Sequence, residues 1–136
     1  MRFYLSFITL AIVSSTLTSC KKTTDDRTDF VSSYGVTETW TENGKMLTKS
    51  VFFMPVYKSS LISNGLLLWN FANYGNSIAV EATVSGNTIS ISQQALSNSR
   101  TIVGTGSIDG SGTLTFAYFE SYGNSLNSVS AIAKKR

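Results

Sequence analysis

Apolar and polar residues alternate along most of the chain after residue 30, with the two-residue period of a half-buried β-strand. The alternation is clear over 34–41, 78–84 and 114–120. Turn signals follow at short intervals, such as Asn43-Gly44 and Ser85-Gly86-Asn87, in which glycine readily takes a positive φ. The pattern therefore predicts a series of strands joined by tight turns.

About eight strands are expected, and no segment is a convincing helix. They cover residues 34–41, 46–57, 66–71, 78–84, 88–92, 100–108, 114–120 and 126–133. Most connections are too short for the dozen or more residues of a parallel crossover, so neighbouring strands should be antiparallel. We predict an all-β, up-and-down meander that closes into a barrel, with a two-sheet β-sandwich as the alternative.

Details within the strands refine this prediction. Pro55 cannot donate a ladder hydrogen bond, so it indicates an edge, a bulge or a strand end. Gly104 and Gly106 inside a strand indicate bending or close approach of another chain segment. The segments 71–78 and 119–126 resemble each other, each with a Tyr-Gly-Asn-Ser turn, which predicts two turns at the same end of the barrel.

The N-terminus has a different character. Met1-Arg2 precedes an apolar run over 3–13, which is shorter than the roughly 20 residues needed to span a bilayer. The following Leu17-Thr18-Ser19-Cys20 resembles the bacterial lipobox, in which an aliphatic and two small residues precede a lipidated cysteine. This resemblance implies a signal peptide over 1–19, cleavage before Cys20, and several acyl chains on the new N-terminus. Cys20 is the single cysteine, so an intrachain disulfide is impossible.

The segment 20–29 has no apolar residue after Cys20, which predicts a flexible tether. Residues 30–136 then form the single domain. Cys-Lys-Lys followed by paired acids looks like the N-termini of Bacteroidetes lipoproteins, and Lys21 after the cysteine favours the outer membrane, in an orientation that stays open. We therefore expect a cell-envelope protein that is held to a membrane by its lipid.

A second resemblance covers nearly all of the mature chain. Phe30, Ser32 and Tyr34 lie where the first strand of the lipocalin and fatty-acid-binding superfamily carries an aromatic residue, a glycine and a tryptophan, so Tyr34 would close the barrel base and Ser32 departs from the pattern. Thr37-Glu38, the turn 73–76 and the strand entry 86–89 look like small lipocalin-like lipoproteins of Bacteroidetes. The resemblance implies a lipocalin-like barrel and carries no specific activity.

The residues offer little for catalysis. The chain has no histidine, which removes the usual general base and a common metal ligand. Paired carboxylates are the remaining enzymatic option: Glu38 and Glu120 each share a strand face with aromatic residues, whereas Glu81 lies on a polar face. We interpret these glutamates as surface charges or as partners of lysine and arginine. We expect no enzyme activity, metal, cofactor or nucleic-acid partner, and the oligomeric state stays open.

The aromatic residues suggest binding instead. An eight-stranded barrel is either filled by side chains or hollow enough for one small ligand. The main hypothesis is a binding module for a small hydrophobic molecule or a glycan; the alternative is a structural or protein-interaction lipoprotein with a filled barrel, using loops such as 59–65. The candidate ligand-lining residues are Trp40, Phe53, Tyr57, Trp69, Phe71, Phe116 and Tyr118.

Overall fold

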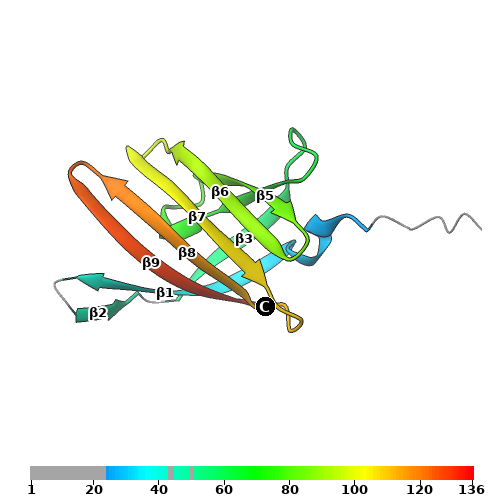
Figure 1. Cartoon of the computed structure of the whole chain (residues 1–136), viewed down its shortest axis with the longest axis horizontal. Coiled ribbons are helices and arrows are strands. Elements are labelled where there is room, and N and C mark those ends of the chain that lie inside the picture. Colours follow the sequence, from blue (N-terminus) through cyan, green and yellow to red (C-terminus); the bar gives the residue numbers. More distant parts are fainter. Residues whose placement is uncertain (1–23, 43–44, 50) are drawn as a thin grey trace, which may run out of the picture.

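The computed structural model of the chain describes residues 24–42, 45–49 and 51–136. The signal peptide, Cys20 and the Asn43-Gly44 turn of the sequence analysis lie outside the described residues. Within them the chain forms nine strands and two short 3₁₀ helices, η1 and η2 (Figure 1). The elements are η1 (Asp26–Asp29), β1 (Ser32–Glu42), β2 (Lys45–Thr48), β3 (Phe52–Lys58), β4 (Gly65–Trp69), η2 (Phe71–Asn73), β5 (Ala79–Ser85), β6 (Thr88–Ala95), β7 (Arg100–Ile108), β8 (Leu114–Tyr122) and β9 (Ser125–Lys135).

The sheet closes into an antiparallel barrel. The strands β1, β3, β4, β5, β6, β7, β8 and β9 pair in this order, and β9 pairs with β1 over Tyr34↔Lys135 to Trp40↔Val129. The extra strand β2 pairs only with β1, over Thr39 to Glu42. This part of β1 lies past Val36, where the ladder with β3 stops. The predicted all-β, lipocalin-like barrel is therefore confirmed, and the β1–β9 pairing excludes the two-sheet sandwich.

Most strands differ from their predicted bounds by one or two residues, and β4 ends at Trp69, so Phe71 lies in η2 rather than in a strand. Two departures are larger. The single strand expected over 46–57 is divided into β2 and β3, which follow each other along the same edge of β1. Pro55 lies inside β3, and the pairing of β3 with β4 begins only at Val56, so the proline stands where that ladder has not yet started. β6 continues through Gln93 to Ala95 with a register shift against β7, because the bulge lets the strand run on past Ile91.

The interior is packed with apolar side chains from alternate positions of every barrel strand. Phe71 contacts Phe116 and Tyr118, with ring centroids 5.4 Å and 4.9 Å apart. A Cβ atom on Gly104 would lie 2.5 Å from Cβ of Tyr118, and one on Gly106 would lie 2.7 Å from the Phe116 ring. These glycines thus make room for the rings that fill the barrel, as close approach predicted.

Two amide side chains replace backbone pairing where neighbouring strands separate. The β3–β4 ladder stops at Val56↔Leu68, and above it Asn70 donates from Nδ2 to the Phe53 carbonyl at 2.7 Å. The β5–β6 ladder stops at Thr83↔Ser90. Past this pair, the Gln94 side chain bonds to both the N–H and the C=O of Glu81. These side-chain hydrogen bonds join the strands where the backbone ladders stop. At each of the two places a shallow gap remains on the outer side of the barrel wall.

The antiparallel order separates the connections into two ends. One end, here the η1 end, carries η1, the chain terminus at Arg136 and the connections 59–64, 86–87 and 109–113. The other, the glutamate end, carries the connections 70–78, 96–99 and 123–124 and lies near Glu38 and Glu120. The two similar turns of the sequence analysis therefore lie at the same end, as predicted.

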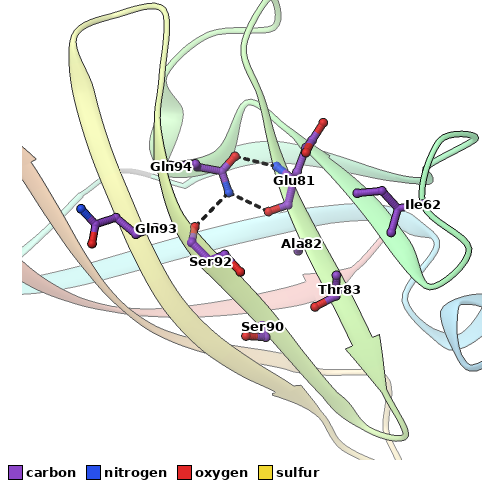
Figure 2. A pocket seen from close by; sticks show the side chains of 8 residues that line it. All are labelled: Ile62, Glu81, Ala82, Thr83, Ser90, Ser92, Gln93 and Gln94. Atoms are coloured by element: carbon purple, nitrogen blue, oxygen red, sulfur yellow. Dashed lines mark hydrogen bonds between the residues drawn. The ribbon is translucent and has the colours of Figure 1, made fainter.

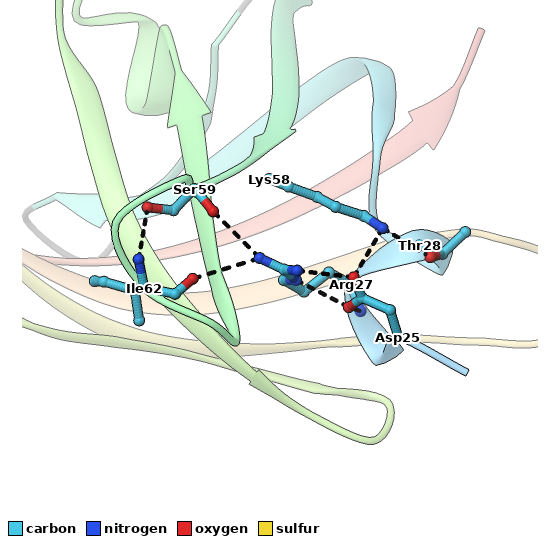
Figure 3. A network of polar contacts seen from close by, with 6 residues as sticks. All are labelled: Asp25, Arg27, Thr28, Lys58, Ser59 and Ile62. Atoms are coloured by element: carbon cyan, nitrogen blue, oxygen red, sulfur yellow. Dashed lines mark hydrogen bonds and ion pairs between the residues drawn. The ribbon is translucent and has the colours of Figure 1, made fainter. Parts of the chain in front are cut away.

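The N-terminal segment is docked on the η1 end, in contrast to the flexible tether expected through residue 29 (Figure 3). Arg27 donates from Nη1 to the carbonyls of Ser59 and Ile62, at 3.2 and 3.4 Å. Asp25 accepts from Arg27 and from Lys58 Nζ, both at close range. An apolar surface is not needed for this docking, because charged hydrogen bonds to loop carbonyls hold the segment.

Candidate functional site

The seven predicted ligand-lining aromatics do not form one site. Phe71, Phe116 and Tyr118 point into the barrel and pack on one another. Trp40 is partly buried against the core at the glutamate end, with Lys49 Nζ 5.3 Å from its ring centroid. The other three, Phe53, Tyr57 and Trp69, lie on the outer face. The structure therefore divides the seven candidates between the barrel interior, the glutamate end and the outer face.

The three outer aromatics line one cleft over the gap between β3 and β4, which we call the aromatic cleft. Phe53, Tyr57 and Trp69 line it together with Pro55 and Asn76, around a space of about 490 Å³. Phe53 is 49% exposed and Tyr57 is 56% exposed. Such half-exposed rings gathered at one place are typical of an interaction surface rather than of a folding core.

Local backbone geometry separates Trp69 from Phe71. Asn70, Ala72 and Asn73 all adopt a left-handed φ, between 53° and 58°. A positive φ at Ala72 is strained, because its Cβ crowds the backbone there. The sharp turn directs Phe71 into the barrel, while Trp69 at the end of β4 remains at the outer cleft. The side chain of Asn70 then stabilises the turn by accepting from the Gly75 N–H at 2.8 Å.

A second groove, which we call the β5–β6 groove, lies over the gap between these two strands. Ser90, Ser92, Thr83 and Gln94 line it, and Figure 2 shows the Gln94 amide spanning the gap to Glu81. The Gln94 amide donates at 2.8 Å and accepts at 3.0 Å. The same amide also donates to the Ser92 carbonyl within β6, at 3.2 Å. The lining therefore combines the hydroxyl groups of the two serines and Thr83 with apolar atoms of Ile62 and Ala82. Sequence reasoning did not identify this groove.

Glu38 is buried in the barrel, with 1% of the residue exposed. Its Oε1 accepts from the Tyr118 hydroxyl at 2.6 Å. Its Oε2 lies 3.3 Å from Lys49 Nζ but has no hydrogen bond of good geometry. The ion pair and one strong hydrogen bond offset only part of the cost of burying this charge.

Glu120 forms the second half of the same buried cluster. It accepts from the Tyr74 hydroxyl and pairs with the Arg100 guanidinium. Arg100 also lies 5.4 Å from the Tyr74 ring centroid and 5.0 Å from that of Tyr122. The two repeated turns thus contribute their tyrosines to one arginine, with Tyr74 packed on the core and Tyr122 at the surface.

These contacts set the chemistry of the glutamate end. Burial raises the pKa of Tyr118 far above its usual range, and the Glu38 charge and hydrogen bond add to the shift. Burial and then the hydrogen bond to Glu120 raise the pKa of Tyr74 similarly. Both tyrosines therefore stay protonated and donate to the carboxylates at neutral pH. Neither glutamate lines the aromatic cleft or the β5–β6 groove. Each is held instead by a tyrosine hydroxyl and a basic side chain.

The partners of the glutamates were not identified from the sequence. Alternation does place Glu38 with Val36 and Trp40, and Glu120 with Phe116 and Tyr118, so their inward direction was accessible. Lys49 and Arg100 gave no signal, because each lies near a strand boundary where periodicity says nothing about direction. Glu81 is exposed, as its position on a polar face predicted.

Two further searches concern the described residues alone. None of the helices in 24–42, 45–49 and 51–136 is long and apolar enough to cross a membrane. Within the same ranges no three His, Cys, Asp or Glu side chains gather to hold a metal ion. Asp109 instead caps its turn, accepting from the N–H groups of Ser111 and Thr113, both at 2.9 Å.

Comparison with known proteins adds no family. A scan against protein-family models finds no match, and a search of curated proteins finds no similar chain. The class that the fold defines is an antiparallel β-barrel domain with a filled interior.

Proposed function

We propose that the protein is a lipid-anchored, non-catalytic binding module of the cell envelope, and that it binds a glycan at the aromatic cleft. The anchor is the lipid on Cys20 that the lipobox resemblance implies. The observation that carries the binding proposal is the gathering of Phe53, Tyr57 and Trp69 at one cleft on the outer face, where the first two rings stay about half exposed.

The chemistry of the cleft favours a sugar over a purely apolar molecule. Flat rings offer apolar faces to the C–H side of a pyranose, while the indole N–H and the tyrosine hydroxyl serve as polar handles. The Asn76 amide lies at the same cleft and adds one donor group and one acceptor. A purely apolar ligand needs an enclosed site in which it leaves water. Apolar side chains of the core occupy the barrel interior, where such a site would lie.

Tryptophan fluorescence of the mature domain, titrated with envelope and host glycans, tests the binding proposal. Trp69→Ala should abolish the response to a binding glycan, and Tyr57→Ala should weaken binding at least tenfold. Phe119→Ala is the matched control, since Phe119 is 50% exposed on the outer face of β8, away from the cleft. Equal loss in the Phe119 variant, or no response to any glycan, contradicts the proposal.

The anchor has its own test. Cys20→Ser should prevent lipidation and leave the precursor uncleaved. Cell fractionation followed by mass measurement of the protein would detect both changes. Normal processing and membrane retention of this variant would contradict the anchor without bearing on the cleft.

A protein-interaction lipoprotein is the second candidate, favoured by a different surface. Val103 and Phe119 face each other across β7 and β8 and line a further apolar cleft with Ala117. A photo-crosslinker at position 119 in intact cells should then trap one defined protein. The same Phe119→Ala variant that leaves glycan binding unchanged would remove this partner.

A further inference from the structure

The docked N-terminal segment fixes where the chain leaves the barrel. It contacts three parts of the η1 end: Arg27 binds carbonyls of the β3–β4 connection, Asp26 accepts from the Gly86 N–H at 2.9 Å, and Lys135 donates to the Asp29 carbonyl at 2.7 Å. Asp25 is the first residue held in this way. Four residues, 21–24, therefore separate Cys20 from the first residue held on the barrel, and we call them the spacer.

This spacer is short compared with the barrel. Four residues reach at most about 14 Å when fully extended. The longest barrel strands have 11 residues, which at about 3.3 Å each and a tilt of about 40° makes the barrel roughly 28 Å tall. A spacer released up to Asp29 would reach about 30 Å, enough to let the barrel turn over. The docked segment removes that freedom.

A second observation at the same end points to lipid. Leu61 is 89% exposed, more than the other large apolar side chains of the described residues. It lies in the connection whose Ser59 and Ile62 carbonyls bind Arg27, next to the point where the spacer begins. An apolar side chain this exposed is stabilised at a bilayer interface, where its methyl groups leave water.

We propose that the η1 end rests on the bilayer that holds the anchor, with Leu61 inserted at the level of the lipid headgroups. The glutamate end and the Asn76 side of the aromatic cleft then point away from the membrane, towards passing ligands. This orientation rests on the lipidation of Cys20 in the proposed function. Figure 3 shows the contacts of Arg27 and Lys58 that hold the docked segment.

Site-specific labelling of the lipidated protein tests the orientation. Leu61→Cys and Asn124→Cys introduce one free thiol each, at the η1 end and at the exposed tip of the β8–β9 turn. Each variant carries an environment-sensitive fluorophore and is reconstituted in phosphatidylethanolamine and phosphatidylglycerol vesicles with nitroxide-labelled headgroups. Quenching should be several-fold stronger at position 61. Adding Arg27→Ala, which releases the docked segment, should reduce the difference between the two labels.

The outcomes separate the two proposals. Protein that fails to bind the vesicles overturns the lipid anchor. Protein that binds but is quenched equally at both positions, or more at 124, overturns the orientation. A label at 61 that is shielded without vesicles shows a protein contact there and also overturns it.

Discussion

The two ends of the barrel are closed by different chemistry. At the η1 end Tyr34 is fully buried and donates its hydroxyl to the neutral Phe30 carbonyl at 2.9 Å. At the glutamate end Tyr118 is as deeply buried and donates to a carboxylate, Glu38, whose second oxygen has no good hydrogen bond. The closure at the η1 end thus buries no charge and costs little free energy. The glutamate end buries carboxylates, which lowers the stability of the fold.

The difference shows which end holds an arrangement that stability alone does not favour. Buried ion pairs are weak evidence of stability, since apolar residues of similar volume often replace them without loss. The glutamate end therefore holds a defined arrangement at some cost, next to the connection that shapes the aromatic cleft. The η1 end combines the Tyr34 closure with the docked segment, in agreement with the proposed orientation on the membrane.

The largest expected effect concerns the packed interior that separates the two ends. In Gly104→Ala the new Cβ would meet Cβ of Tyr118 at 2.5 Å and the Ala117 carbonyl at 2.7 Å. Since the backbone cannot yield cheaply, the free energy of unfolding should fall by about 3 kcal/mol or more. Gly110→Ala, with open space around its Cβ, is the control in denaturant unfolding. Equal stability of the two variants would mean that the interior is not filled.

Alkaline pH should weaken the η1 end. Burial raises the pKa of Tyr34 to about 12, with a smaller contribution from the Asp29 charge. Because the folded-state pKa lies above the ordinary value of 10.0, its stabilising contribution is complete below that pH and is lost as the pH rises towards 12. The loss is about 2 to 3 kcal/mol. Urea unfolding at pH values from about 9 to about 12 measures this loss. Tyr34→Phe should make the decline less steep without removing it, because Tyr74 and Tyr118 also have raised pKa values in the folded state.

Removing one hydroxyl at each end compares the closures directly. Tyr118→Phe takes away the hydrogen bond to a buried carboxylate and should lower the free energy of unfolding by about 2 kcal/mol. Tyr34→Phe removes a bond to a neutral carbonyl and should cost about 1 kcal/mol. Thermal unfolding of both variants at neutral pH is the measurement. A smaller loss at position 118 than at 34 would contradict the distinction between the ends.

The smallest effect on stability is expected at the docked segment. Hydrogen bonds from Arg27 and then from Lys58 hold the pKa of the Asp25 carboxyl well below its usual range. Docking should therefore persist at neutral pH and weaken as the pH falls below the ordinary value of 3.8. Arg27→Ala should leave the melting temperature nearly unchanged and speed hydrogen exchange at Thr28 and Phe30. Unchanged exchange would show that Arg27 does not hold the segment.

Alternation predicted most of the barrel but not which face every residue takes. In β8 the polar and apolar positions are distinct, so Phe116 and Tyr118 were identified with one face. In β3 the run Phe52-Phe53-Met54-Pro55-Val56-Tyr57 is apolar in both phases, so nothing in the sequence separates inside from outside. The same holds for Leu66 to Trp69. The aromatic cleft lies in those two strands, so the sequence alone could not place its rings on the outer face.

Contacts between distant segments were the other limit. The pairing of Glu120 with Arg100 and Tyr74 depends on barrel closure, which brings β7, β8 and the 70–78 connection together. The docking of Arg27 on backbone carbonyls leaves no pattern, because any loop supplies carbonyl groups. Charge and low apolar content predicted a tether through residue 29. In the structure, hydrogen bonds hold the chain on the barrel from Asp25 on.

The two tryptophans allow the most direct test of where a ligand binds. Trp69 lies at the aromatic cleft and Trp40 at the glutamate end, so their indole N–H signals in an NMR spectrum report on two separate places. Addition of a binding glycan should shift the Trp69 signal and leave the Trp40 signal in place. A shift confined to Trp40 would place the ligand at the barrel mouth and contradict the account.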